Sequence, residues 1–402
     1  MMENGPLVVE TLPYRPGPAP AMPSTHIDSL AELDRLEWHV GQPGDPADLV
    51  ERFLTGHRLG AGALHPTHRP PTPAGGAAVG ATLFVSAAAG ATMIGAPPGP
   101  PSPAAAVPDV VVVVYRHRPA PPPAAGTRPA DWWLGPWQPS WTPRAHAAAV
   151  TAARTAIGRG DIYQVNVVGH TSARYTGDPV PALTRLGRLP GARYGGVLTG
   201  DGWAIGCASP ETLLEARGGR LLTRPIKGTR PATDTGRAQL LASAKERAEH
   251  IMIVDLERND LARVAATGSV RVDELYRIRR WCDLWQAEST VSAHAADGLG
   301  LADLLRAICP PGSVTGTPKL SALHQIAAHE PVGRGAGMGA LGWVGPDHID
   351  LGVTIRTAAT DGERVHVWAG GGITWDSDPD AEVAEAAAKS GPVRAALAPT
   401  TG

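Results

Sequence analysis

Short apolar runs in the first third of the chain stand between long stretches rich in Gly and Pro. The runs ATLFVSAAAGATMIGA (81–96) and VVVVVY (110–115) have the length and apolar content of β-strands. The stretches at 95–110 and 116–133 are poor material for helices and strands, so they predict loops. We expect residues 1–130 to form a loop-rich β part of the fold, and we find no candidate chemistry in it.

The rest of the chain has a denser pattern in which helices and strands are mixed. Pro143 opens an Ala-rich helix that ends near Gly158, and DIYQVNVV (161–168) follows as a strand. Gly218-Gly219 predicts a hairpin turn between two further strands. Helices are expected over 236–252, continuing toward NDLARVA, and from Ser377-Asp378-Pro379 onward. Because the elements do not alternate as regular βαβ units, the pattern favours an α+β fold.

Composition narrows the class of protein. The 402 residues are 43% hydrophobic and carry a formal net charge of −2, with no basic block, which argues against a nucleic-acid or anionic-membrane binder. No apolar run reaches the roughly 18 residues that span a bilayer, and the N-terminus lacks a signal-peptide pattern. The chain has three scattered cysteines, Cys207, Cys282 and Cys309, whose spacing indicates neither a disulfide framework nor a zinc site. We therefore expect a cytoplasmic protein.

Lysine is rare, and its positions are informative. Lys and Arg together number 36, of which only four are Lys: Lys227, Lys245, Lys319 and Lys389. Arginine keeps its proton, so it cannot serve as a nucleophile, whereas lysine can when its pKa is lowered. Lys227, in PIKGTRP, is therefore the first candidate nucleophile.

Two pairs of carboxylates have helical i,i+3 spacing. Glu246 and Glu249 lie on one predicted helix, and Glu382 and Glu385 lie on the last one. This spacing puts each pair on one helical face, and four converging carboxylates would suit Mg²⁺. Each pair alone is more typical of a solvated helix face, so the spacing by itself is a weak signal. Lys389 shares the face of Glu385 and could hold a substrate carboxylate.

Three glycine-rich segments could approach an anion, but two lack the required context. GSVTGTPK (312–319) does not have the P-loop pattern, and GAGMGALG (335–342) precedes predicted strands rather than a helix, so a Rossmann site is not expected. AGGGITWDSDPD (369–380) could present bare backbone N–H groups.

Taken in order, the distinctive segments resemble the chorismate-utilising enzymes, which include anthranilate, aminodeoxychorismate, isochorismate and salicylate synthases. The resemblance covers about 145–390. It rests on GDIYQVN (160–166), ASPETLL (208–214), RPIKGTRP (224–231), KERAEHIMIVDLERNDLARV (245–264), CPPGSVTGTPK (309–319), IRTA (355–358) and AGGGITWDSDPDAEVAEAAAK (369–389). It implies a chorismate-binding fold, with two large, mostly antiparallel sheets packed together, helices outside, and the catalytic part at 131–398.

Three positions favour one branch of that family. Lys227 stands where anthranilate and isochorismate synthases usually have Ala, and it resembles the aminodeoxychorismate synthase lysine that attacks the ring. Gln164 stands where isochorismate and salicylate synthases place a water-activating Lys, so water should be a poor nucleophile here. Asn166 also resembles the aminodeoxychorismate branch.

The resemblance also implies roles for other residues. Glu211 would protonate the departing C4 hydroxyl, and Thr229 would hydrogen-bond near it. Glu246, Glu249, Glu382 and Glu385 would hold Mg²⁺, which would orient the ring carboxylate. The substrate would be held by Gln164, Arg356, Lys389 and the backbone N–H groups of Gly370, Gly371 and Gly372.

Two positions depart from the family pattern. Gln286 replaces a usual His, and Gly337 replaces a usual aromatic residue. A glutamine cannot shuttle a proton, so its presence disfavours pyruvate elimination, which anthranilate formation requires.

We therefore expect amination of chorismate at C4, with ammonia from a separate glutamine amidotransferase subunit. The alternatives are a synthase of 2-amino-2-deoxyisochorismate or anthranilate, and a non-catalytic chorismate-binding regulator.

Overall fold

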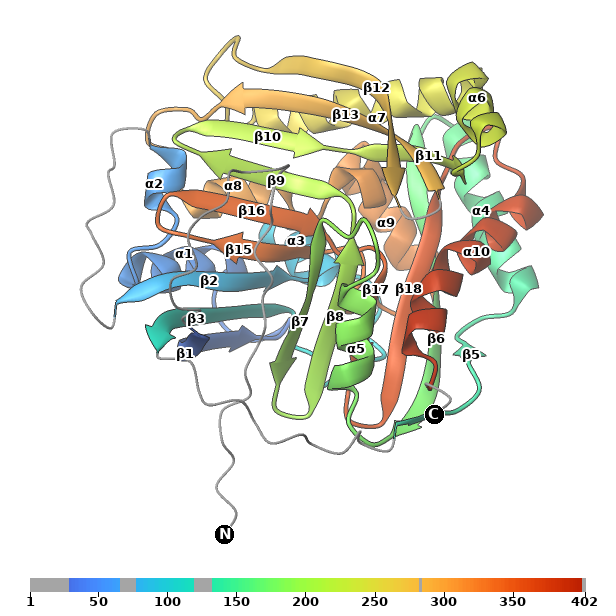
Figure 1. Ribbon diagram of the computed structural model, residues 1–402. Helices are drawn as coiled ribbons and strands as arrows, with labels where there is room; N and C mark the ends of the chain where they lie inside the picture. The colour runs from blue at the N-terminus through green and yellow to red at the C-terminus, as the bar shows by residue number, and fades with distance from the viewer. Residues whose placement is uncertain (1–28, 66–76, 119–131, 282–283, 400–402) are drawn as a thin grey trace.

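Two antiparallel β-sheets with helices around them make up the protein (Figure 1). The computed structural model describes residues 29–65, 77–118, 132–281 and 284–399. The predicted α+β fold with two large antiparallel sheets is confirmed. The expected loop at 95–110 is free of helix and strand as far as Asp109, whereas most of the loop expected at 116–133 lies outside the described residues.

The larger sheet joins the N-terminal strands to strands from the middle and later parts of the chain. Its order is β1-β3-β2-β15-β16-β9-β10-β13-β11, with β12 also paired to β13. The N-terminal strands therefore continue the same sheet as the strands that follow residue 200. The strands are β1 (Ser29–Trp38), β2 (Ala78–Val85), β3 (Val110–Arg118), β9 (Thr212–Arg217), β10 (Arg220–Arg224), β11 (Ile226–Pro231), β12 (Arg271–Trp281), β13 (Leu284–His294), β15 (Ala340–Val344) and β16 (His348–Val353).

The smaller sheet has the order β14-β6-β18-β17-β8-β7, with the short strands β4 and β5 on β6. The long central pair, β6 and β18, runs antiparallel in register from Arg174↔Arg364 to Val165↔Ile373. The strands are β4 (Trp133–Leu134), β5 (Gln138–Pro139), β6 (Gln164–Thr176), β7 (Tyr194–Gly200), β8 (Trp203–Ser209), β14 (Gly316–Thr317), β17 (Thr357–Thr360) and β18 (Arg364–Ile373).

The helices begin largely where the capping residues predict. Thr142 caps α4, and Asp378 caps α10, each followed by Pro at the first helical position. The helices are α1 (Pro46–Gly56), α2 (Ala61–Leu64), α3 (Ala87–Met93), α4 (Pro143–Gly158), α5 (Val180–Gly187), α6 (Asp234–Ala242), α7 (Ala244–Ala262), α8 (Leu301–Ile308), α9 (Lys319–His329) and α10 (Pro379–Leu397), with a 3₁₀ turn at Gly312–Val314.

Two sequence expectations were wrong because a serine caps a helix. The run at 81–96 is a strand only as far as Val85, since Ser86 caps α3 through Ala89 N and the following Ala residues continue as helix. The helix expected over 236–252 is interrupted at Ser243, whose hydroxyl accepts from Glu246 N and starts α7.

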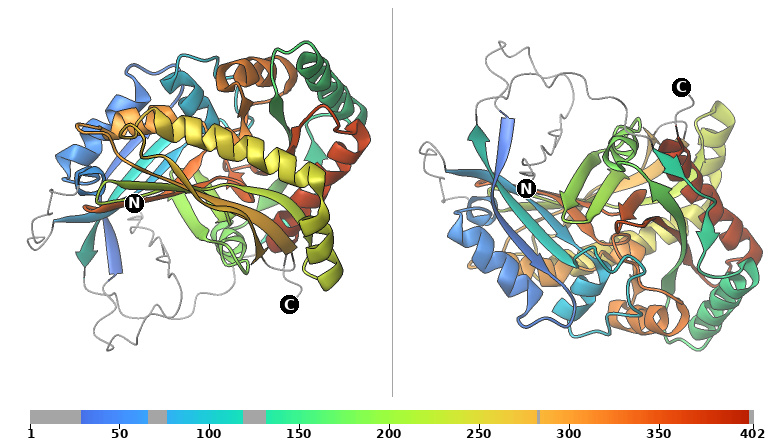
Figure 2. Two further views of the ribbon diagram at one scale, coloured as in Figure 1. Left: turned by 90° about the horizontal axis from the view of Figure 1, so that it is seen from above. Right: turned by 90° about the horizontal axis from the view of Figure 1, so that it is seen from below.

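The two sheets and their helices enclose one main hydrophobic core. Its residues come from both sheets, including Leu83 and Val112 of the larger and Ile205 and Trp368 of the smaller. The long helix α7 crosses the larger sheet, while α4 and α10 lie side by side on the smaller one (Figure 2). Helices α7 and α10, which carry the two predicted carboxylate pairs, thus flank different sheets.

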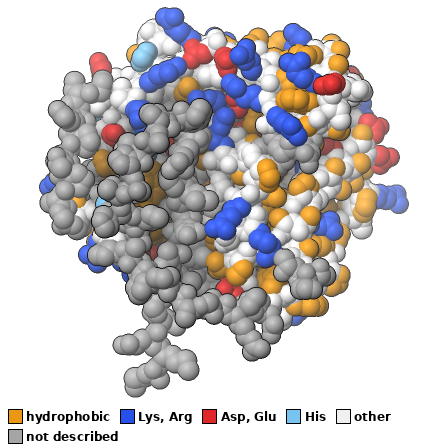
Figure 3. Space-filling model, viewed as in Figure 1, with side chains coloured by type: hydrophobic (Ala, Val, Ile, Leu, Met, Phe, Trp, Pro, Cys, Tyr) orange, Lys and Arg blue, Asp and Glu red, His pale blue; other side chains and the backbone are white. Residues whose placement is uncertain are grey.

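The surface carries both signs of charge. In the face drawn in Figure 3, basic side chains gather at the upper edge over β12 and β13, with acidic side chains between them. Arg279, for example, pairs with Glu274 at 2.9 Å. Among the described residues, no helix is long and apolar enough to cross a membrane.

Candidate active site

Lys227 lies on β11, opposite Ala287 of β13, with its side-chain nitrogen turned toward the 3₁₀ turn. Its Nζ donates to the carbonyl of Ser313 at 2.9 Å. The pairing register shifts between Lys227 and Thr229, at Gly228, which has φ +71°. A Cβ at Gly228 would lie 3.0 Å from Glu246 Oε2, so glycine permits both the positive φ and the close approach of α7.

Glu211, in the short link between β8 and β9, is the carboxyl coupled most strongly to Lys227. Its side chain is buried, with 4% of the residue exposed. Burial raises the pKa of Glu211, against the opposing effects of Lys227 and the Ser313 hydroxyl. Burial likewise lowers the pKa of Lys227, against the opposing carboxylate of Glu211. Both shifts act against the charged forms of the two groups.

The glycines at the end of β18 let polar groups of β6 and α10 approach closely. A Cβ at Gly372 would lie 2.2 Å from Gln164 Nε2 and 3.7 Å from Lys227 Nζ. A Cβ at Gly371 would lie 2.8 Å from Glu382 Oε2, and 3.9 Å from both Glu385 Oε1 and Lys389 Nζ. The structure therefore brings Gln164 and the α10 pair to the same strand end as Lys227.

The two carboxylate pairs face the site but hold other partners. Glu246 pairs with Arg230 at 3.0 Å, and Glu385 pairs with Lys389 at 2.7 Å. Glu382 accepts from the Ser377 hydroxyl at 2.7 Å.

The pairs approach Lys227 from both helices, since the charges of Glu249 and Glu385 both act on its pKa. Among the described residues, no three His, Cys, Asp or Glu side chains are assembled as a metal cluster. The donor set is all carboxylate oxygen, which fits Mg²⁺, an ion that uses one or two carboxylates and keeps several waters.

The remaining predicted residues lie around the same pair. Arg356 is half-buried at φ +53°, and its charge acts on the pKa of Glu211. Lys389 donates to the carbonyl of Gly370 at 3.0 Å. Beyond Val367, β18 has β6 on one side and no β17 partner on the other among the described residues.

The two departures from the family pattern lie in different surroundings. Gln286 is paired opposite Thr229, and its Nε2 is 3.5 Å from the Thr229 hydroxyl. Gly337 packs on Trp368, since its Cβ would lie 2.8 Å from Trp368 Cβ. Trp368 in turn lies against His170, with ring centroids 5.2 Å apart. An aromatic side chain at 337 would therefore collide with Trp368.

Sequence reasoning missed several residues that support the site. Ser313 contacts both Lys227 and Glu211, yet within CPPGSVTGTPK it carried no predicted role. His250, next to Glu249, is hydrogen-bonded to Ser289 at 2.6 Å, and burial lowers its pKa to about 4. Its position in the KERAEH segment was the available signal.

A buried ion pair accounts for another of the rare lysines. Lys319 binds Asp260 at 2.7 Å, with both side chains nearly inaccessible. Glu257 lies beside this pair, accepts from Thr223 at 3.2 Å and has its pKa raised to about 8, chiefly by burial and also by the charge of Asp260.

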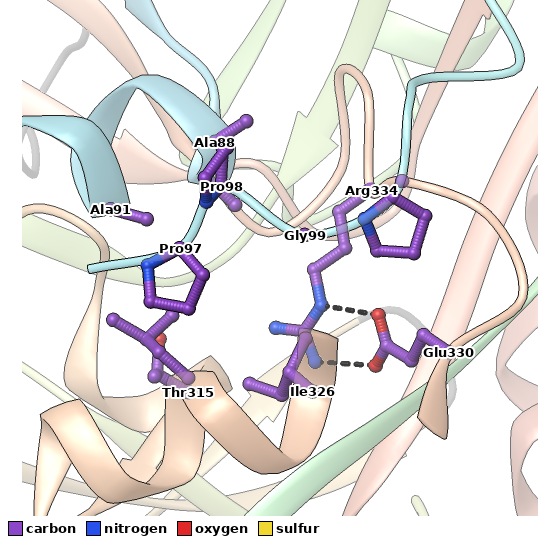
Figure 4. Close-up of a pocket in the computed structure, with 13 residues that line it drawn as sticks. Ala88, Ala91, Pro97, Pro98, Gly99, Thr315, Ile326, Glu330 and Arg334 are labelled. Carbon is purple, nitrogen blue, oxygen red and sulfur yellow. Dashed lines mark hydrogen bonds and ion pairs between the residues drawn. The ribbon is translucent and has the colours of Figure 1, made fainter. Parts of the chain in front are cut away.

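A small pocket drawn in Figure 4 lies outside the Lys227 site. It is lined by Pro97–Pro100, Thr315 and the ion pair between Glu330 and Arg334, whose shorter contact is 2.6 Å. Its cavity volume of about 20 Å³ holds a water molecule or two rather than a ring-sized substrate. Arg334 also donates to the carbonyls of Val314 and Asn166, so this pair supports the turn and strand behind the site.

Comparison with known proteins identifies the family of the chain. Residues 104–395 match the model of a family described as chorismate binding enzyme. Anthranilate synthase component 1 of Streptomyces coelicolor is 39% identical over 274 residues, covering 66% of this chain and 54% of that protein. Aminodeoxychorismate synthase component 1 of Salmonella typhimurium is 39% identical over 256 residues, covering 62% and 56%. The chain spans about half the length of the curated relatives it matches.

A solved structure shows the same fold. Anthranilate synthase component I from Streptococcus pneumoniae superimposes with a TM-score of 0.73 and 24% identity, covering 98% of this chain and 100% of that chain. Since the family model spans well over half of its residues, the chain belongs to the chorismate-binding enzyme family.

Proposed function

We propose that the protein aminates chorismate at C4 and releases 4-amino-4-deoxychorismate. The observation that carries the proposal is the position of Lys227. It lies on β11 beside buried Glu211, and burial raises the pKa of the acid and lowers the pKa of the amine. A neutral amine is the form that attacks, and a protonated carboxyl is the form that assists a departing hydroxyl.

In the first half of the proposed reaction, Lys227 Nζ forms a bond to ring carbon C2. The two ring double bonds shift, the C4–O bond breaks, and the proton of Glu211 leaves with the hydroxyl as water. Lys227 is then a protonated secondary amine, and Glu211 is a carboxylate. The charges of the two groups balance, which suits a buried site.

In the second half, ammonia forms a bond to C4. The double bonds shift back, and the C2–N bond breaks, so Lys227 departs as a neutral amine. The new ammonium at C4 returns a proton to Glu211. The sum is chorismate plus ammonia giving the 4-amino product plus water, with both residues restored.

We assign the surrounding residues to substrate and metal. Arg356, Lys389 and the backbone of Gly370–Gly372 would hold the substrate carboxylates, and Thr229 would hydrogen-bond near C4. Glu246, Glu249, Glu382 and Glu385 would hold Mg²⁺, directly or through water, where it would neutralise and orient the ring carboxylate. Mg²⁺ bound there would compete with the ion pairs that Glu246 makes with Arg230 and Glu385 makes with Lys389.

Amination at C2, leading toward anthranilate, is the second candidate. The 39% identity to an anthranilate synthase component 1 favours it. Two residues disfavour this candidate. Lys227 would direct the amine to C4, and Gln286 has no proton to transfer at neutral pH. A non-catalytic chorismate-binding regulator would need neither Lys227 nor the carboxylates beside it.

We propose that the ammonia comes from a glutamine amidotransferase subunit. The relatives at 39% identity are both named component 1, which supports a second component for this chain as well.

Product analysis tests the function. Purified protein incubated with chorismate, Mg²⁺ and an ammonium salt should give the 4-amino product by mass spectrometry. Anthranilate would support the second candidate, and unchanged chorismate would support the regulator.

A further inference from the structure

A buried ion pair that the proposed reaction does not use lies behind the 3₁₀ turn Gly312–Val314. Lys319 Nζ is 2.7 Å from Asp260 Oδ2, and the two side chains are only 9% and 8% exposed. Burying two charges costs solvation that their attraction only partly returns, so such a pair is often no more stabilising than apolar residues of similar size. Stability alone therefore does not account for this pair, and its contacts indicate what else it does.

The pair connects the two ends of the segment that carries the turn. Lys319 follows the turn as the first residue of α9, and its Nζ also donates to the carbonyl of Ala307, in α8 before the turn, at 3.2 Å. Asp260 comes from α7, and Gly312 packs against it. A Cβ at Gly312 would lie 3.1 Å from Asp260 Oδ2 and 2.8 Å from Leu256 Cδ2. The ion pair thus holds both ends of this segment together and against α7.

A second buried ion pair holds the other side of the turn. Arg334 donates to the carbonyl of Val314, the last residue of the turn, at 2.7 Å. Glu330 fixes that guanidinium through a contact of 2.6 Å, which Figure 4 shows. Ser313, the middle residue of the turn, therefore lies between the attachments made by two buried ion pairs.

The same face of α7 also reaches the chain beside Glu211. Glu257 lies three residues before Asp260, so the two side chains share a helical face. Glu257 Oε2 is 3.2 Å from the Thr223 hydroxyl, which is 3.4 Å from the carbonyl of Thr212, the residue after Glu211. One face of α7 thus supports both the turn and the link that carries the buried acid.

The turn meets both groups of the proposed reaction at Ser313. Its carbonyl accepts from Lys227 Nζ at 2.9 Å, and its hydroxyl acts on the pKa of Glu211. We propose that the ion pair of Lys319 and Asp260 positions both groups by holding Ser313 in place, an inference that rests on the proposed function. A displacement of about 1 Å can cost a reaction about 10²-fold in rate, so the loss of this support should be measurable.

The test replaces the pair without leaving a buried charge unpaired. The double variant Lys319→Met, Asp260→Val puts apolar side chains in both positions, so its free energy of unfolding in urea should stay close to that of the wild type. Its kcat for amination should fall by about 10²-fold. Its KM for chorismate should change little, because the groups assigned to the substrate carboxylates come from β18, α10 and Arg356.

Asp361→Asn is the matched control for a loss of stability. Asp361 Oδ2 lies 3.0 Å from Nε2 of buried His366, in the turn that joins β17 to β18 of the smaller sheet. This variant should lower the free energy of unfolding and leave kcat unchanged. Gly312→Val is a second test, which keeps both charges and decides the question if the double variant does not fold. Its side chain would meet Asp260 and Leu256, displace the turn and lower kcat at an unchanged KM.

Three results would overturn the inference alone. The first is a folded double variant, or a folded Gly312→Val variant, with the kcat of the wild type, which would make the pair merely structural. The second is a higher KM for chorismate at an unchanged kcat, which would assign the pair to substrate binding. The third is an equal loss of kcat in Asp361→Asn, which would attribute the effect to stability. A wild-type protein that forms no aminated product from chorismate, Mg²⁺ and ammonia would overturn the proposed function, and this inference with it.

Discussion

Lys227 and Glu211 meet at a single residue, Ser313. The lysine donates to the Ser313 carbonyl at 2.9 Å, and the Ser313 hydroxyl lowers the pKa of Glu211, against the larger effect of burial. Lys227 comes from β11 and Glu211 from the short link between β8 and β9, and both lie against the 3₁₀ turn Gly312–Val314. The lysine proposed as the nucleophile and the glutamate proposed as the acid are thus brought together at one short turn.

Lys227 should be indispensable for the 4-amino product. We expect Lys227→Ala to lose that product because no other described amine has the same position. Lys227→Arg should fail as well, since a guanidinium stays protonated. Both variants are assayed for product by mass spectrometry. Full activity of both, with an unchanged product, would show that Lys227 is not the nucleophile.

Glu211→Gln should lower kcat by about 10²–10⁴-fold, the usual contribution of a general acid. Chorismate affinity should change little, because the amide keeps the shape of the carboxyl. The rate is measured in single turnover so that product release does not hide the effect. A higher KM for chorismate with an unchanged kcat would instead make Glu211 a substrate-binding residue.

The buried carboxyl of Glu257 should make the free energy of unfolding depend on pH. Its pKa is raised from 4.5 to about 8, mainly by burial. A raised pKa means that the folded state favours the protonated form. The stabilisation is therefore complete below pH 4.5 and declines as the pH rises through 8.

Glu257→Gln removes this titration and keeps an acceptor for Thr223. Relative to the wild type, its stability should be similar near pH 4.5 and greater near pH 8, because only the wild type must then ionise a buried carboxyl. Urea unfolding of both proteins at both pH values measures this difference in the free energy of unfolding. Asp255→Asn, on the exposed side of α7, is the matched control and should shift stability by less than about 0.5 kcal/mol. Equal differences at both pH values would contradict the account.

The four carboxylates predict a requirement for Mg²⁺. Activity should disappear in excess chelator and return with added Mg²⁺. Removing Glu246 or Glu382 should raise the Mg²⁺ concentration for half-maximal activity by about 10–100-fold. Asp255→Asn again serves as control. Undiminished turnover in chelator, or in a Glu249→Ala, Glu385→Ala double variant, would rule out the site.

Local sequence signals predicted much of the fold and several neighbours of Lys227. The capping residues and Pro143 marked α4, and Gly218-Gly219 marked the turn between β9 and β10. The helix starts at Ser86 and Ser243 were missed, because a single capping serine does not change the pattern of apolar positions in the run around it. Ser313 was missed for another reason: it acts through its carbonyl, which every residue has, so only the folded turn identifies it.

The central claim is amination at C4 with retention of the enolpyruvyl group. Gln286, opposite Thr229, has no titratable proton for the aromatisation step that forms anthranilate. The most direct measurement uses purified protein with chorismate, Mg²⁺ and ammonia, in the absence of any lyase, and follows fluorescence and product mass together. We predict a non-fluorescent aminated product that keeps the enolpyruvyl group. Fluorescence of anthranilate growing in with time would contradict the account.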